Sequence, residues 1–232
     1  MERYIRNMSM LTPEENAKLN DYKVCVVGCG GLGGYIVEML ARLGIGTVTV
    51  VDGDVFNESN LNRQLYCDEN TLGKSKAEMA KERIHIVNPL VIINSFTEFL
   101  REDNANEILK GHHVIVDALD NIPARKLVQS YAEKLNIPFV HGAIAGWYGQ
   151  VSTILPGDKT LDVLYSNKEE KGIENKLGNP SFTPALVASI QVSEVLKILI
   201  NRGELLQNKI LYINLLDQDY SIINLKNKEI VK

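Results

Sequence analysis

The sequence predicts an α/β fold: a doubly wound, mostly parallel sheet that is extended by antiparallel strands toward the C-terminus. Short apolar runs rich in valine, such as Lys23–Val27 and Thr47–Val51, alternate with segments of helical periodicity, which is typical of parallel strands buried on both faces. A glycine-rich turn follows the first of these runs directly. After Gly146 the regular strand–helix alternation stops, and we expect antiparallel pairing there.

Local signals place the first helices. Thr12 is a good N-cap, Pro13 suits the first helical position, and two acidic residues follow near the positive end of the helix. After the first strand and its glycine turn, Ile36, Leu40 and Leu43 recur at helical spacing. Gly44 is then expected to end that second helix.

The middle of the chain continues the alternation. A helix over residues 73–87 is expected to stop at Asn88-Pro89. The remaining elements that we expect here are a strand over 91–96, a helix over 103–110, a strand over 113–116, a helix over Ile122–Leu135 and a strand over 138–141.

The last part of the chain mixes strands with one long apolar helix. Strands are expected over 150–155, 210–214 and 220–225, and the helix over 184–200 is expected in the core. Residues 156–180 are polar and unpatterned, and a loop of that length is usually functional or disordered. We therefore predict a single domain over 1–232: an N-terminal arm and helix (1–20), a nucleotide-binding half (21–146) and an antiparallel extension (147–232) with a crossover loop (156–180).

Composition narrows the function classes. The chain has 232 residues, of which 45% are apolar, and a net charge of −4, which argues against general binding to nucleic acid or anionic membranes. It lacks an apolar signal region at its start and an apolar run of the roughly 20 residues that span a bilayer. We expect a cytoplasmic protein. Three cysteines without a C-x-x-C pair, and four scattered histidines, predict neither a disulfide framework nor a zinc site.

The glycine turn predicts a nucleotide site. Gly28, Gly30 and Gly33 satisfy the G-x-G-x-x-G fingerprint of Rossmann-like dinucleotide-binding folds, in which backbone N–H groups at a helix start face phosphate oxygens. Asp52 ends the second strand, where the ribose-binding acid of such folds belongs. Taken alone, the fingerprint also fits NAD, and Asp52 also fits a capping role.

Two cations and a carboxylate favour a triphosphate. Arg63 and Lys76 follow Asp52 within about 25 residues, in segments that leave the carboxyl edge of the sheet. A two-phosphate dinucleotide would not obviously need both. Asp120, after the strand that ends near Asp117, could hold Mg²⁺ shared with phosphates. Asp117 is the competing candidate for that role.

Four motifs together resemble the ThiF/MoeB/HesA family, the bacterial relatives of ubiquitin-activating enzymes. They are GCGGLG, D-G-D-x-F-x-x-SNLNRQ, G-K-S-K and D-A-L-DN, and the resemblance spans nearly the whole chain from Arg3-Tyr4-Ile5-Arg6 to the closing strands. The SNLNRQ segment after the glycine turn is the specific part. The resemblance implies an ATP- and Mg²⁺-dependent adenylyltransferase. Its substrate would be the C-terminal glycine of a small ubiquitin-like sulfur carrier of the ThiS or MoaD type, ending in Gly-Gly.

The resemblance also implies residue roles. Asp52 would contact the ribose of ATP, Lys76 would neutralise phosphates, and Asp120 would hold Mg²⁺ and nucleotide. Arg6 matches an arginine that reaches into the partner subunit's site, which implies a homodimer. The implied catalytic set is Arg6, Arg63, Lys76 and Asp120, and the implied nucleotide-binding set is Gly28, Gly30, Gly31, Gly33, Asp52, Asp54, Ser59, Asn60, Leu61, Asn62, Arg63, Gln64, Lys76, Asp120 and Asn121.

The chain departs from the fuller family pattern in its cysteines. Residues 156–232 contain none, so neither paired C-x-x-C zinc ligands nor a crossover-loop nucleophile is expected unless Cys29 or Cys67 substitutes. Cys29 lies at an expected helix N-terminus, which could lower the pKa of its thiol. It occupies the unspecified position of the glycine turn, which argues against a catalytic role. Adenylation needs no general base, because a C-terminal carboxylate with a pKa near ~3.5 is already ionised at neutral pH.

Three other readings stay open at this point. A relative could activate another carboxylate or a tRNA base, although the acidic net charge weakens the tRNA version. An NAD-dependent oxidoreductase could use the same fold. A binding protein could keep a relic nucleotide site, and the apparent completeness of Arg63, Lys76 and Asp120 argues against it.

Overall fold

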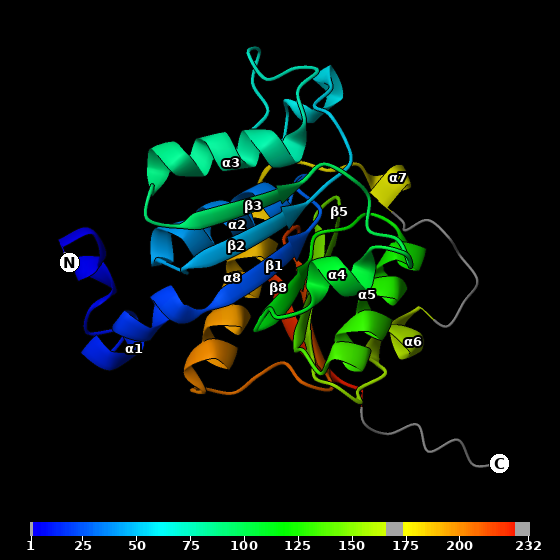
Figure 1. Ribbon diagram of the computed structural model, residues 1–232. Coiled ribbons are helices and arrows are strands. Elements are labelled where there is room, and N and C mark those ends of the chain that lie inside the picture. Colours follow the sequence, from blue (N-terminus) through cyan, green and yellow to red (C-terminus); the bar gives the residue numbers. More distant parts are fainter. Residues whose placement is uncertain (1, 166–173, 226–232) are drawn as a thin grey trace.

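The computed structural model describes residues 2–165 and 174–225, and the described strands form one mixed sheet (Figure 1). The sheet has eight strands in the order β3-β2-β1-β4-β5-β6-β7-β8. The first five of that order are parallel and the last three join them antiparallel. The predicted fold class is therefore confirmed. The strands are β1 (Lys23–Val27), β2 (Thr47–Val51), β3 (Ile92–Phe96), β4 (Val114–Asp117), β5 (Phe139–Ala145), β6 (Tyr148–Ile154), β7 (Lys209–Asn214) and β8 (Asp219–Asn224).

Helices cover both faces of the parallel part. Alternate residues of β1 point to opposite sides: Val24 and Val26 belong to one core cluster, Cys25 and Val27 to the other. The first cluster lies under α2 (Gly33–Leu43), α3 (Lys76–Val87) and α8 (Phe182–Ile200), and the second under α4 (Ala105–Leu109) and α5 (Ile122–Leu135). The shorter elements are η1 (Glu2–Asn7), α1 (Pro13–Lys18), η2 (Leu19–Asp21), η3 (Glu58–Asn60), α6 (Thr160–Leu164) and α7 (Glu174–Leu177).

Some boundaries differ from the predictions for local reasons. Strand β5 continues past His141 to Ala145, because Gly142 there leaves room for Gln191 of α8: a Cβ at Gly142 would lie 2.3 Å from the Gln191 Cδ. Helix α3 begins at Lys76, not at residue 73, because Ser75 caps it by accepting a hydrogen bond from the Glu78 N–H. The predicted loop over 156–180 contains α6 and α7, and its residues 166–173 lie outside the described part.

Of the described helices, α8 alone is long and apolar enough to span a membrane by length and composition. It packs against α2, β5 and β6, and Val187, Ala188 and Val195 are fully buried. Those contacts are the ones a core helix makes. We interpret α8 as the helix that ties the antiparallel extension to the parallel half.

Candidate active site

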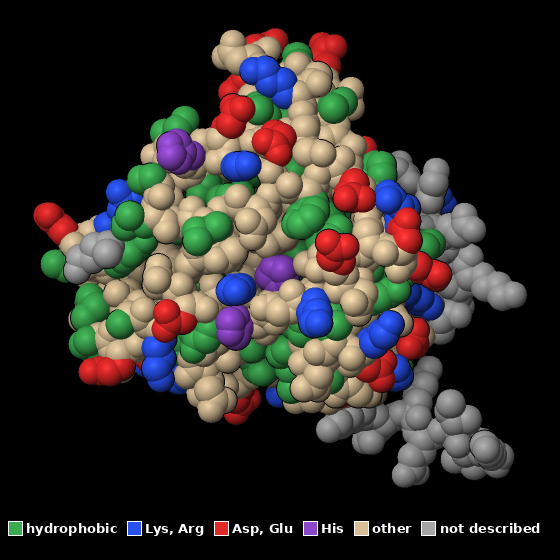
Figure 2. All heavy atoms as spheres, in the orientation of Figure 1, with side chains coloured by type: hydrophobic (Ala, Val, Ile, Leu, Met, Phe, Trp, Pro, Cys, Tyr) green, Lys and Arg blue, Asp and Glu red, His purple; other side chains and the backbone are tan. Residues whose placement is uncertain are grey.

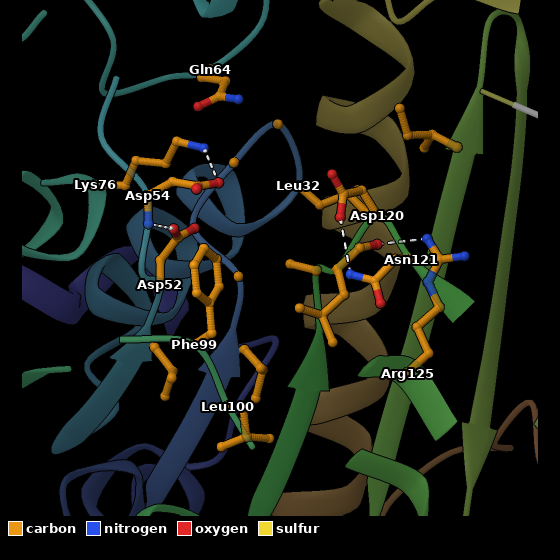
Figure 3. A pocket seen from close by; sticks show the side chains of 18 of the residues that line it. Leu32, Asp52, Asp54, Gln64, Lys76, Phe99, Leu100, Asp120, Asn121 and Arg125 are labelled. Atoms are coloured by element: carbon orange, nitrogen blue, oxygen red, sulfur yellow. Dashed lines mark hydrogen bonds and ion pairs between the residues drawn. The ribbon is translucent and has the colours of Figure 1, made fainter. Parts of the chain in front are cut away.

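A cavity of about 470 Å³ opens at the carboxyl edge of the sheet, beside the ends of β1 and β4. Helix α2 follows β1 on one face, whereas α5 follows β4 on the other, so the chain diverges at this point. Open α/β sheets bind ligands at such a divergence. Figure 3 shows Asp52, Asp54 and Lys76 on one side of the cavity, and Asp120, Asn121 and Arg125 on the other.

The glycine turn brings backbone close to backbone at the cavity floor. Gly28 has φ +96°, and a Cβ on it would lie 2.5 Å from the carbonyl oxygen of Ala118. A Cβ on Gly33 would lie 2.0 Å from the carbonyl oxygen of Gly28, so α2 can begin here only without a side chain. Gly30 and Gly31 line the cavity beyond these contacts. The turn thus leaves the N-terminal end of α2 open to a ligand anion.

Asp52 is held by the turn it faces. Its Oδ2 accepts a hydrogen bond from the Cys29 N–H at 2.6 Å, and its Oδ1 accepts one from the Asp54 N–H at 2.8 Å. Burial raises the pKa of Asp52, and these two N–H donors work against that rise. Each oxygen keeps a second lone pair. The carboxylate is therefore fixed in orientation and can still accept hydrogen bonds from a ribose.

A lysine faces the same cavity from α3. Lys76 is the first residue of that helix and is 7% exposed. Its Nζ lies 3.2 Å from Asp54 Oδ2, and both side chains line the cavity. A buried ammonium needs a partner of opposite charge. Here the partner is Asp54, whose side chain is more than half exposed to solvent. Lys76 can therefore offer its charge to a ligand while Asp54 turns to water.

The SNLNRQ segment is split between cavity wall and scaffold. Arg63 and Gln64 line the cavity. Arg63 Nη1 donates to the Ser59 carbonyl at 2.8 Å and to Asn62 Oδ1 at 2.9 Å, which holds the guanidinium on its own turn. The other predicted members are not in the cavity lining: Ser59, Asn60, Leu61 and Asn62 form the turn instead.

Two of those scaffold residues have defined partners. Asn60 is buried, and its Oδ1 accepts a hydrogen bond from the Asn57 N–H at 3.0 Å. Asn62 Nδ2 donates to the Asn179 carbonyl at 3.0 Å, which ties the turn to the segment before α8. Gly33 likewise lies outside the cavity lining and serves the packing of α2. These residues shape the site without facing it.

The two carboxylates predicted as candidates for a metal, Asp117 and Asp120, differ in their exposure. Asp117 is fully buried, and its Oδ2 accepts a hydrogen bond from His141 Nδ1 at 2.6 Å. Asp120 is exposed and lines the cavity beside Asn121, whose Oδ1 caps α5 through the Ala124 N–H. Asp120 is therefore the carboxylate that a ligand in the cavity can reach.

The structure adds wall residues that sequence reasoning missed. Phe99 and Leu100 form an apolar side suited to a flat base. Arg125 and Asn179 also line the cavity. Arg125 follows Asn121 by one helical turn on α5, so the four-residue spacing could have pointed to it. Phe99 and Leu100, which follow β3, and Asn179, which precedes α8, carry no comparable spacing signal in the sequence.

Two polar atoms in the lining fit a ligand. Within the described residues, Gln64 Oε1 and Asn179 Oδ1 are buried and accept no hydrogen bond. Buried polar atoms of native proteins nearly always have a partner. A polar ligand or water in the cavity would satisfy them.

The remaining predicted groups lie away from the cavity lining. Arg6 is exposed on η1 and is not part of it. Cys29 is fully buried, and burial raises the pKa of its thiol, so the predicted lowering by the helix N-terminus is wrong. Cys25 and Cys67 are also buried thiols, and burial raises the pKa of each. Over the described ranges no three His, Cys, Asp or Glu side chains come together as a metal site.

A family model, two relatives and a solved structure match this chain. The ThiF family model matches residues 2–230. The SAMP-activating enzyme E1 of Haloferax volcanii is 34% identical over 229 residues, covering 96% of this chain and 84% of the relative. The sulfur carrier protein adenylyltransferase of Thermus thermophilus is 34% identical over 231 residues, covering 95% of this chain and 85% of the relative. The crystal structure of Escherichia coli MccB with ATP superposes with a TM-score of 0.79 at 20% identity, covering 98% of this chain and 72% of that one, and shares the fold.

Proposed function

The chain belongs to the ThiF family, and from that premise we propose that it is an adenylyltransferase for a small ubiquitin-like sulfur-carrier protein. It would join the carrier's C-terminal glycine carboxylate to the adenylyl group of ATP and release pyrophosphate. The observation that carries the proposal is one cavity in which the glycine turn, the Asp52 carboxylate and the Lys76 and Arg63 cations meet. Of two relatives that match nearly the whole chain, one is named a sulfur carrier protein adenylyltransferase and the other a SAMP-activating enzyme E1.

Several residues that line the cavity have proposed roles in ATP binding or adenylyl transfer that follow from their chemistry. Asp52 would accept hydrogen bonds from the ribose, and the apolar wall at Phe99 would contact the adenine. Lys76 and Arg63 would stabilise the charge that develops on the leaving pyrophosphate, because preorganised cations in a partly dry site act strongly there. The carrier carboxylate is ionised at neutral pH and needs positioning but no base.

A magnesium ion fits the donor set on the Asp120 side of the cavity. Mg²⁺ is usually bound by one or two protein carboxylates together with phosphates and water, and Asp120 is an exposed carboxylate in the lining. When bound, the ion would neutralise phosphate charge. Asn121 caps α5 next to Asp120 and keeps that carboxylate at the cavity mouth. We propose no zinc site, and this stays a prediction.

Three further parts of the proposal concern assembly, location and partners. Arg6 would complete the site of a second copy, so the active form would be a homodimer. The protein would act in the cytoplasm. Bulk nucleic acid is not expected as a partner: on the face in Figure 2, Lys and Arg side chains are interspersed with Asp and Glu and form no continuous basic surface.

Carrier-dependent exchange of pyrophosphate into ATP tests the proposal. We expect exchange with a cognate carrier, and none with the same carrier lacking its terminal glycine. NADH and bulk tRNA serve as the comparison ligands for the alternative readings. Tight NADH binding with no ATP binding would favour an oxidoreductase, whereas a tRNA gel shift without carrier-dependent exchange would favour a tRNA-modifying relative. Either result would contradict the carrier assignment.

A further inference from the structure

A chain of polar side chains, buried except at the half-buried Tyr165, includes one wall residue of the cavity. It runs from Asp117 at the end of β4 through His141 of β5 to Tyr165 after α6, and then to Arg125 of α5, which lines the cavity. Asp117 and His141 are fully buried and Arg125 is 4% exposed. The carrier proposal assigns none of the middle members a role.

The contacts of this chain fit a neutral His141 whose Nε2 accepts from the Tyr165 hydroxyl and from Gln150 Nε2, which lies 3.3 Å away. Asp117 Oδ2 lies 2.6 Å from His141 Nδ1, so Nδ1 carries the proton and Nε2 is left as an acceptor. The Tyr165 hydroxyl lies 3.2 Å from that Nε2 and donates to it. Its oxygen then accepts from Arg125 Nη1 at 3.1 Å and from Gln150 Nε2 at 2.9 Å. Burial lowers the pKa of His141, in keeping with a neutral ring.

The same chain orients the guanidinium from several sides. Arg125 Nη2 donates to the Leu119 carbonyl at 2.5 Å, and Arg125 Nε lies 3.6 Å from Asp117 Oδ2. The Arg125 Cζ also sits 5.8 Å from the centroid of the Tyr165 ring. A planar group with directional donors is positioned by such contacts. Tyr165, which follows α6, supplies a hydrogen bond and a ring contact to Arg125 from a segment about 40 residues away in the chain.

We propose that His141 and Tyr165 are positioning residues that hold the Arg125 guanidinium in the wall of the nucleotide cavity. This inference rests on the proposed function, because the ligand is taken to be ATP. An apolar cluster of similar volume would pack as well or better than a buried polar one. The polar members therefore point to the placement of a charge next to the cavity, and not to stability alone.

The test replaces Tyr165 by Phe, which keeps the ring beside Arg125 and removes only the hydroxyl. The matched control is Tyr131→Phe on α5, the helix that carries Arg125. The Tyr131 hydroxyl donates to the Glu102 carbonyl at 2.8 Å and lies outside the cavity lining. Calorimetry with Mg²⁺ and ATP is expected to show a Kd about tenfold weaker for Tyr165→Phe, the scale of one hydrogen bond to a charged group. Tyr131→Phe should bind as the unmodified protein does.

A double-mutant cycle separates positioning from a general structural role. If Tyr165 acts through Arg125, then Tyr165→Phe should weaken ATP binding by less than about twofold when Arg125 is already Lys, since interacting residues are non-additive. A ligand-free readout is the Nε–H NMR signal of Arg125, which should shift in Tyr165→Phe and stay in place in Tyr131→Phe.

Each outcome bears on the inference. Equal ATP binding by Tyr165→Phe and the unmodified protein, or the same loss in the Arg125→Lys background, would overturn the positioning role and leave the proposed function standing. An unmodified protein that binds no ATP would overturn both.

Discussion

Lys76 Nζ lies 3.2 Å from Asp54 Oδ2 on one side of the cavity, and this pair joins the start of α3 to the loop after β2. The Lys76 side chain is nearly buried, whereas the Asp54 side chain is more than half exposed to solvent. The ammonium is thus compensated without a ligand, and its partner can move into water when a phosphate takes its place.

Replacement of Lys76 by Ala should remove a cation from the point where pyrophosphate charge develops. We expect carrier-dependent exchange to fall by about 10²–10³-fold, by analogy with the loss of one charge-stabilising donor in other active sites. Lys74→Ala is the matched control, because Lys74 is exposed, two residues away and outside the cavity lining. An equal loss in both variants would argue that Lys76 acts only through the fold.

Replacement of Asp120 by Asn should raise the Mg²⁺ concentration needed for half-maximal exchange, because an amide binds Mg²⁺ less well than a carboxylate. Chelation of Mg²⁺ should abolish exchange in the unmodified protein. Asp103→Asn, at an exposed position outside the lining, is the control. An unchanged Mg²⁺ titration for Asp120→Asn would move the metal site elsewhere.

Gly33→Ala should destabilise the fold itself. The added Cβ would lie 2.0 Å from the Gly28 carbonyl oxygen, and overpacking of this kind costs about 1–3 kcal/mol or more. Gly31→Ala is the steric control, since its Cβ would meet nothing closer than 3.7 Å. Thermal unfolding should show a lower Tm for Gly33→Ala and an unchanged Tm for Gly31→Ala. A reversed order would show that the turn rearranges freely.

The buried His141 should make stability depend on pH. Burial lowers its pKa below the ordinary value of 6.5, so the unfolded chain takes up a proton more readily than the folded one. The stabilisation is present above that ordinary value and is lost as pH falls below it, by at most about 1.4 kcal/mol per pH unit for one group. Burial lowers the pKa of His112 as well, which adds to the slope.

Urea unfolding at pH 7.5 and 5.5 measures this dependence. The difference between the two free energies should shrink in His141→Asn, which keeps a donor near Asp117 but does not titrate. His85→Asn, at an exposed position on α3, is the control and should keep the full difference. If the His141→Asn protein also keeps the full difference in unfolding free energy between the two pH values, His141 is not the group that titrates.

The homodimer proposal can be tested with mixed subunits. Arg6→Ala and Lys76→Ala proteins should each lose most of their exchange activity, and a mixed dimer should regain part of it, because one of its two sites would contain both unmodified side chains. Absence of rescue in a confirmed mixed dimer would show that Arg6 does not act across the interface.

Local chemistry allowed the framework to be predicted closely. The bounds of β1, β2 and α5 match the predicted ranges. These elements begin or end at residues with one strong conformational preference, such as the Gly28 turn and the Asn121 cap. Where such a signal was weak, as at Gly142 in β5, the prediction stopped too early.

The sequence by itself determined the order of strands and helices, and it determined that Arg63, Lys76 and Asp120 leave the sheet at the same edge. Periodicity and turn residues suffice for that, because they act over a few residues. Tertiary structure alone decided that Asp120 and not Asp117 meets the cavity, that the Cys29 thiol is buried, and that Tyr165 reaches Arg125. Those outcomes depend on burial and on contacts between segments distant in the chain, which no local pattern encodes.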